Sequence, residues 1–216
     1  LLKLTGIVLL AAPAGEYDKR VVIRTKECGK ITAFARGVRR PGNQLMAAAA
    51  PFVFGKFLLY EGRDAYTLAG AEVENYFREI AGDMEAACYG SYFLELADYY
   101  GRENIDATET LRLLYQSLRA LLKPSVPNRL VKPVYELKLM EINGEYRELP
   151  LGRLNDSTLY AWQYVLAAPV ESLYTFTLTD QVLGEFVRCV EQNKERFIDK
   201  TFHSLDILNA VMDNAT

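Results

Sequence analysis

The sequence predicts an α+β protein with two domains, a small closed β-barrel over residues 1–75 and an α-helical bundle over residues 76–216. Three observations predict this class. Short β-rich segments separated by glycine-rich turns fill the first part, and the hydrophobic period then changes to that of a helix. The length of 216 residues suits one large domain or two small ones.

Five short segments of the first part are predicted as strands. Each is rich in apolar or β-branched residues and is bounded by Gly, Pro or a polar turn. They span residues 4–10, 20–25, 30–36, 51–60 and 65–73. Because five strands with little helix leave exposed edges unless the sheet closes, we expect a closed barrel.

The remainder predicts five or six helices, from apolar residues that recur at helical spacing. The first is one long helix from Phe77 to near Gly101, and Pro124 ends the second. Pro133 near the start of the third is expected to delay or kink it. The later helices are expected over residues 128–142, 159–167, 179–200 and 205–212.

Composition excludes several classes of protein. No run of about 18 apolar residues occurs, which excludes a transmembrane helix, and the apolar start predicts a strand rather than a signal peptide. Cys28, Cys88 and Cys189 form no pair motif, which excludes a disulfide scaffold and fits a reducing cytoplasm. We therefore expect a cytoplasmic protein with no membrane partner.

Motifs for catalysis and for metal binding are missing from the sequence. The single histidine, His203, has no cysteine nearby and is expected to lie on the surface or to cap a helix. No phosphate-binding glycine loop, CxxC pair or EF-hand loop occurs. We expect no catalytic residue, no metal site and no cofactor, and hence no enzyme.

Charge is distributed unevenly along the chain. Residues 1–60 carry ten Lys or Arg and three acids, whereas residues 61–216 carry fifteen basic and twenty-five acidic residues. A basic first part on an acidic body suggests a polyanion as partner, although small domains also differ in charge by chance.

The basic residues of the first part are the candidate nucleic-acid site. Guanidinium groups suit bidentate contacts with phosphate. Arg20, Arg24 and Lys26 are separated by even numbers of residues, so a regular strand would place them on one face. Neighbouring aromatic residues either stack on bases or pack in the core. For the basic residues, the alternative to a nucleic-acid site is a solvated face without a partner. The candidate set is Lys19, Arg20, Arg24, Lys26, Lys30, Arg36, Arg39 and Arg40.

A second basic cluster lies within residues 112–138, where Glu136 is the only acid. A basic rim around an apolar groove would suit an acidic peptide with hydrophobic anchors, and a plain exposed helix face is the alternative. The basic candidates are Arg112, Arg119, Lys123, Arg129 and Lys132, and the apolar ones are Leu121, Leu130 and Val134.

Several short pieces, in this order along the chain, resemble the bacterial recombination mediator family RecO. They are residues 5–9 (TGIVL), 16–19 (EYDK), 29–33 (GKITA), 35–41 (ARGVRRP), 71–72 (AE) and 204–208 (SLDIL). The resemblance covers most of the chain. It implies an N-terminal OB-fold barrel followed by a helical domain.

The resemblance also implies a function. Members of this family bind single- and double-stranded DNA, anneal complementary strands and, with RecR, help load RecA onto DNA coated by single-strand-binding protein (SSB). They bind the acidic C-terminal tail of SSB through the helical domain and are not enzymes. It implies a cytoplasmic, nucleoid-associated protein that uses the segment with Lys30, Arg36, Arg39 and Arg40 for DNA.

The chain departs from the family pattern at one place. Many relatives carry a four-cysteine zinc module where this chain has residues 145–157, which contain no cysteine, and this chain is some tens of residues shorter. Either the module was lost or a segment is omitted here. No zinc is expected for the chain as it stands.

Two other functions stay open at this point. One is a generic OB-fold protein that binds RNA, because telling RNA from DNA depends on contacts to the 2′-hydroxyl. The other is a protein-interaction adaptor that does not bind DNA directly. The steep salt dependence of phosphate binding separates nucleic-acid binders from the adaptor.

Overall fold

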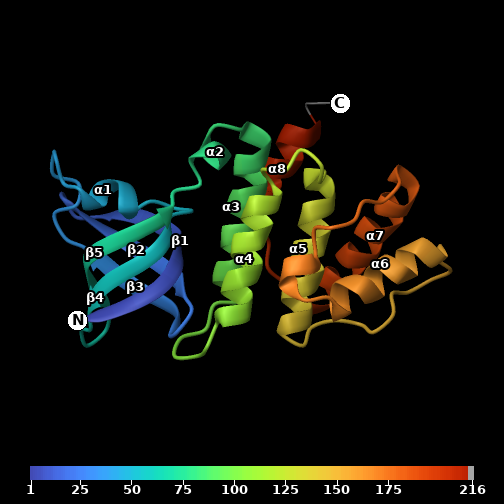
Figure 1. Cartoon of the computed structure of the whole chain (residues 1–216), viewed down its shortest axis with the longest axis horizontal. Coiled ribbons are helices and arrows are strands. Elements are labelled where there is room, and N and C mark those ends of the chain that lie inside the picture. The colour runs from blue at the N-terminus through green and yellow to red at the C-terminus, as the bar shows by residue number, and fades with distance from the viewer. Residues whose placement is uncertain (214–216) are drawn as a thin grey trace. The chain divides into compact units, whose positions relative to one another are not determined.

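The computed structural model describes residues 1–213 and confirms a closed five-stranded barrel followed by helices (Figure 1). The strands are β1 (Leu2–Ala14), β2 (Asp18–Thr25), β3 (Gly29–Ala35), β4 (Phe54–Tyr60) and β5 (Tyr66–Asn75). Their order around the barrel is β1-β2-β3-β5-β4, and the pairing of β1 with β4 closes it. The β3–β5 pair is parallel and the other pairs are antiparallel.

Alternation along the strands builds the barrel core. Every second residue of β3 is buried, including Ile31 and Ala33. Their neighbours on β2, Val21 and Ile23, are fully buried in the same cluster, and Phe57 of β4 fills it from the other side. The core therefore takes alternate residues of β3, whereas β2 is buried continuously from Val21 to Thr25.

Strand lengths differ from the prediction at two places. β1 runs from Leu2 to Ala14 with a register shift between Val8 and Leu10, because β2 and β4 pair with different stretches of it. The strand predicted from Pro51 starts at Phe54, and Phe52 before it has a left-handed φ of +72° that a regular strand does not adopt. A short helix that was not predicted, α1 (Leu45–Ala48), precedes it.

The helices that follow the barrel are either single turns or longer helices. They are α2 (Arg78–Ala81), α3 (Met84–Tyr99), α4 (Thr108–Ala120), α5 (Asn128–Ile142), α6 (Asp156–Ala167), the 3₁₀ turn η1 (Val170–Ser172), α7 (Asp180–Phe197) and α8 (His203–Asp213). No helix within residues 1–213 is long and apolar enough to span a membrane.

The single helix predicted from Phe77 is wrong, because the chain forms two helices there. Gly82 caps α2, and the Asp83 carboxylate accepts the Ala86 N–H at 2.9 Å to start α3. Side-chain capping of this kind satisfies an N–H that has no partner inside the helix.

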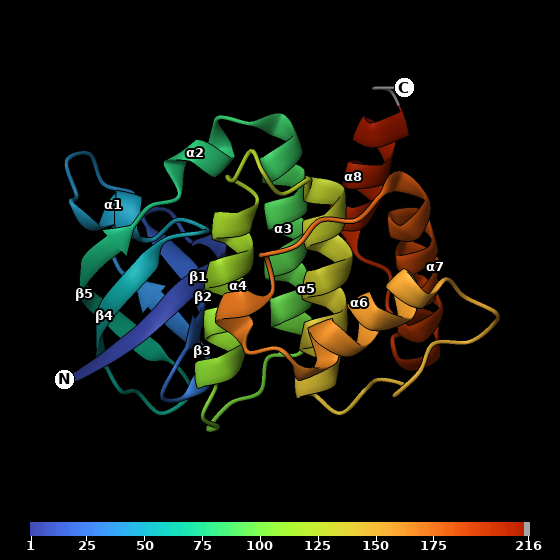
Figure 2. The ribbon, with the colours of Figure 1, turned by 45° about the vertical axis from the view of Figure 1, so that its right-hand side comes forward.

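By contacts the chain forms two compact units. The first consists of residues 1–82 and 94–111, and the second starts with residues 83–93 and continues from Arg112. Within the second unit α5, α6 and α7 pack on one another, as Figure 2 shows.

Candidate nucleic-acid interface

Two loops of the first unit meet at the end of the barrel where β2 begins and β3 ends. The Arg39 N–H donates to the Tyr17 carbonyl at 2.8 Å, and the Gly37 N–H donates to the Asp18 carboxylate at 2.7 Å. The Arg39 guanidinium also donates to the Gly15 carbonyl at 3.3 Å. The β1–β2 turn and the segment after β3 are therefore joined by both backbone and side chains.

The segment after β3 is a series of turns with fixed geometry. Gly37 has φ +63°, a left-handed conformation that favours glycine, and its carbonyl accepts the Arg40 N–H at 3.1 Å. The Asn43 amide donates to the same carbonyl at 3.1 Å, and its oxygen accepts the Leu45 N–H at 2.9 Å. This turn chemistry presents the arginines of the segment to solvent.

Five of the eight predicted basic residues lie at this end of the barrel, on the start of β2 or on the segment after β3, and are called the basic loop surface. Lys19 lies opposite Ala35 and Arg20 opposite Phe34, so both strand ends contribute. Arginines 36, 39 and 40 are exposed, whereas Lys19 is half-buried and donates to the Ala49 carbonyl at 3.3 Å. The basic loop surface is Lys19, Arg20, Arg36, Arg39 and Arg40.

Nothing in the described part of the chain neutralises the basic loop surface through an ion pair. Its five cations form no salt bridge among residues 1–213. Of the nearby acids, Asp18 accepts the Gly37 N–H, and Glu16 is engaged by the Tyr17 hydroxyl. The guanidinium groups are therefore available to phosphate oxygens.

The other three predicted basic residues lie at the opposite end of the β2–β3 hairpin. Arg24 is 3% exposed and donates to the Thr110 hydroxyl at 2.7 Å. Lys30 donates to the Asp98 carbonyl at 3.1 Å and pairs with its carboxylate at 3.3 Å. Lys26 is exposed, one residue beyond the end of β2.

The face expected to carry Arg20, Arg24 and Lys26 together does not form. β2 ends at Thr25, so strand parity no longer applies to Lys26, and Arg24 is covered within the first unit. The even spacing of residues along a strand cannot show which other segments pack on the outside of a barrel. A contact between these residues and DNA stays a prediction.

Tyr17 is the aromatic residue placed on the basic loop surface itself. Its side chain is 41% exposed, and the Arg40 guanidinium carbon lies 5.1 Å from the ring centroid. A hydrogen bond with the Glu16 carboxylate raises the pKa of the Tyr17 hydroxyl. By contrast, Tyr66 packs against the barrel core.

The apolar slot predicted in the helical part does not form as an opening. Leu121, Leu130 and Val134 are 6%, 2% and 0% exposed and belong to the packed interior. Apolar residues at helical spacing beside a proline turn fit a core as well as they fit a groove, and here they form a core.

Most of the basic residues predicted around that slot have acidic partners. Arg112 pairs with Glu171 and Arg129 pairs with Asp180. In the described residues, Arg119 and Lys123 are the two exposed members of the set that form no ion pair.

The remaining member, Lys132, lies in a buried ionic cluster. Its amino group is 3.1 Å from Glu136 and 2.8 Å from Glu191, and Lys194 is 3.0 Å from Glu136. The Tyr92 hydroxyl donates to Glu136 at 2.6 Å. Burial works against the charge on Lys132, but the two carboxylates outweigh it and raise its pKa.

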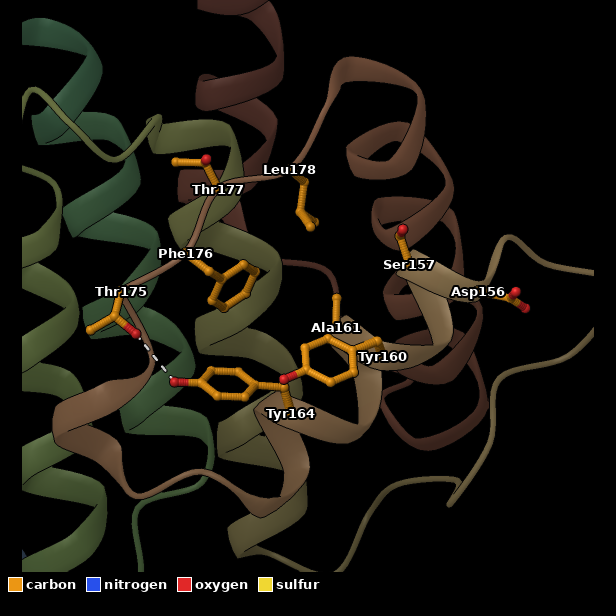
Figure 3. A pocket seen from close by; sticks show the side chains of 9 residues that line it. All are labelled: Asp156, Ser157, Tyr160, Ala161, Tyr164, Thr175, Phe176, Thr177 and Leu178. Atoms are coloured by element: carbon orange, nitrogen blue, oxygen red, sulfur yellow. Dashed lines mark hydrogen bonds between the residues drawn. The ribbon is translucent and has the colours of Figure 1, made fainter.

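A cavity that sequence reasoning missed opens beside α6 (Figure 3). It is open to solvent and has a volume of about 700 Å³ between α6 and residues 175–178, and its lining includes Tyr160, Tyr164, Phe176 and Leu178. The Tyr164 hydroxyl is 3.2 Å from the Thr175 hydroxyl, and its ring meets Phe176 edge-on at 5.3 Å. The only sequence signal was the spacing of Tyr160 and Tyr164, which predicts a shared helix face.

Within residues 1–213 no group of three or more His, Cys, Asp or Glu side chains is placed to hold a metal ion. Where relatives are expected to carry a zinc module, residues 145–155 form a loop of exposed and half-buried residues, and residues 156–157 begin α6.

Two family models match the chain, "Recombination protein O N terminal" over residues 1–77 and "Recombination protein O C terminal" over residues 81–149. The DNA repair protein RecO of Acetivibrio thermocellus is 24% identical over 243 residues, which cover 97% of each chain. The RecO proteins of Alkaliphilus metalliredigens and Bacillus subtilis are 35% and 32% identical, over 67% and 69% of this chain and 58% of each relative.

The alignment with the Acetivibrio protein is longer than this chain, 243 positions against 216 residues. That relative therefore carries residues without a counterpart here, in accord with the expectation that this chain is shorter than its family.

Proposed function

We propose that this chain, which belongs to the RecO family of DNA repair proteins, binds single- and double-stranded DNA and anneals complementary strands. With RecR it helps RecA load onto DNA coated by SSB. We place it in the cytoplasm at the nucleoid, acting without bond-breaking chemistry, zinc or another cofactor.

One observation carries this proposal, the basic loop surface. Five cations lie at one end of the barrel, two at the start of β2 and three in the segment after β3, and none forms an ion pair among the described residues. A fixed set of unpaired guanidinium groups suits the regular phosphates of a nucleic-acid backbone. Backbone contacts carry no sequence information, so binding should depend little on base identity.

A strand-annealing assay tests the proposal. Complementary strands coated with SSB are mixed with the full-length chain, without ATP and with EDTA, and duplex formation is followed. We expect annealing well above the rate without protein, and we expect Arg36→Ala/Arg39→Ala/Arg40→Ala to lose it. A requirement for ATP or a metal, or full activity of the triple variant, would contradict the proposal.

The proposed SSB contact lies in the helical part. Of the set predicted for it, Arg119 and Lys123 near the end of α4 are exposed and form no ion pair among residues 1–213. They can meet the carboxylates of an acidic tail, whereas the buried apolar members of the set stabilise the helices beneath.

Titration of the full-length chain with a fluorescent SSB tail peptide tests this contact. Arg119→Ala/Lys123→Ala should weaken binding about tenfold, whereas Arg188→Ala/Arg196→Ala, an equal charge change on α7, should change it less than twofold. Equal losses of affinity for the two double variants would mean that the SSB tail binds elsewhere on the chain.

A further inference from the structure

We propose that the Tyr17 ring is a stacking surface for one unpaired base, and that it favours single strands over duplex on the basic loop surface. This inference rests on the proposed nucleic-acid binding and goes beyond phosphate contacts, because it names a residue that recognises the base.

The first support is that Tyr17 is held in place while its ring stays accessible. Its carbonyl accepts the Arg39 N–H at 2.8 Å, and Gly15 before it has φ +71° and accepts the Arg39 guanidinium. The side chain is nevertheless 41% exposed. A residue whose backbone is fixed before binding loses less conformational entropy when a base stacks on its ring.

The second support is the position of Arg40. Its guanidinium carbon lies over the Tyr17 ring, 5.1 Å from the centroid, so phosphate-binding donors stand over one face of the ring and a base would stack on the other. A nucleotide carries a base and a phosphate on one sugar, and this pair offers a contact for each. Free phosphate would use the cations alone and leave the ring unused.

Base pairing explains why the site discriminates. Bases inside a duplex are stacked on both faces, and exposing one costs a few kcal/mol in unstacking. An unpaired base meets an aromatic ring without that cost. The Tyr17 ring therefore adds affinity for single strands, whereas the cations of the basic loop surface bind both forms.

The chain offers a matched control for this geometry. Tyr76 is 38% exposed, and the Arg78 guanidinium carbon lies 4.7 Å from its ring centroid. Tyr76 lies outside the basic loop surface, and the exposed residues Glu74 and Glu79 near it are acids. Replacing Tyr76 removes an equivalent ring where no phosphate is expected to bind.

The experiment measures binding of the full-length chain by fluorescence anisotropy with three probes. They are a mixed-sequence single strand, a strand of equal length made of abasic sites, and a blunt-ended duplex of two strands. Tyr17→Ala should weaken binding to the normal strand about five- to a hundredfold, the range for one base–aromatic stack. Its affinity for the abasic strand and the duplex should change less than twofold.

Two variants complete the test. Tyr17→Phe keeps the ring and should bind the normal strand within twofold of the unmodified chain, and Tyr76→Ala should do the same. An equal loss on normal and abasic strands would show that Tyr17 only positions Arg40, which overturns the stacking proposal. Failure of the unmodified chain to bind any probe would instead overturn the proposed function itself.

Discussion

Glu136 is a fully buried carboxylate in the second unit, and three groups compensate its charge. The Tyr92 hydroxyl and the amino groups of Lys132 and Lys194 lie 2.6, 3.1 and 3.0 Å from it. Burying such a set gives little net stability, but removing one member leaves the others buried without their partner. The cluster therefore makes single substitutions costly.

Glu136→Ala should lower the free energy of unfolding by about 3–5 kcal/mol, because both lysines lose a buried carboxylate. Urea unfolding followed by circular dichroism measures the change. Glu195→Ala, an exposed carboxylate of the same helix as Lys194, should change the unfolding free energy by less than about 0.5 kcal/mol. Equal losses for the two variants would contradict this account of the cluster.

Acid should weaken this cluster through Glu191. Burial opposes the charge on Glu191, but Lys132 and Lys194 outweigh it and lower the pKa of the carboxyl below 4.5. A carboxyl with a lowered pKa in the folded state stabilises the protein above its unfolded pKa, and this contribution is lost as the pH falls through the folded value.

Glu191→Gln should therefore be less stable than the unmodified chain at pH 7, and the difference should shrink as the pH falls below about 4.5. Urea unfolding of both proteins between pH 7 and pH 3 measures it. A difference that stays constant or grows toward low pH would show that Glu191 does not contribute through its charge.

At the scale of elements, capping decided where the helices start. The apolar spacing of Phe77, Ile80 and Met84 predicts one continuous helix, yet Met84 is 73% exposed and the chain breaks before it. Gly82 and Asp83 were visible in the sequence as an end and a start signal, but the hydrophobic period outweighed them in the prediction.

Asp83→Ala should lower the free energy of unfolding by about 1 kcal/mol, since the Ala86 N–H loses the carboxylate that caps α3. Asp83→Asn keeps a side-chain oxygen and should lower the free energy of unfolding by only about a few tenths of a kcal/mol. Thermal unfolding of both variants provides the comparison. A loss as large in Asp83→Asn would mean that the charge and not the cap matters.

At the scale of the whole molecule, the closed barrel and most of the helices after it followed from periodicity and turns alone. The grouping of residues 94–111 with the barrel did not, since it depends on contacts between distant residues, such as those of Arg24 with Thr110 and Lys30 with Asp98. For the same reason the sequence predicts a nucleic-acid site of eight basic residues, whereas the fold brings five of them together.

The salt dependence of single-strand binding tests the central claim, that the basic loop surface binds phosphates. Affinity of the full-length chain for a mixed single strand is measured across a salt series, for the unmodified protein and Arg36→Ala/Arg39→Ala/Arg40→Ala. Three exposed arginines of the second unit, replaced in Arg153→Ala/Arg188→Ala/Arg196→Ala, provide a control of equal charge.

The account predicts that the barrel variant binds about a hundredfold more weakly at low salt. Its slope of log affinity against log salt should fall by about two, as three lost phosphate contacts require, and the control should keep its slope. A correctly folded barrel variant with an unchanged slope, or equal loss in both variants, would contradict the claim.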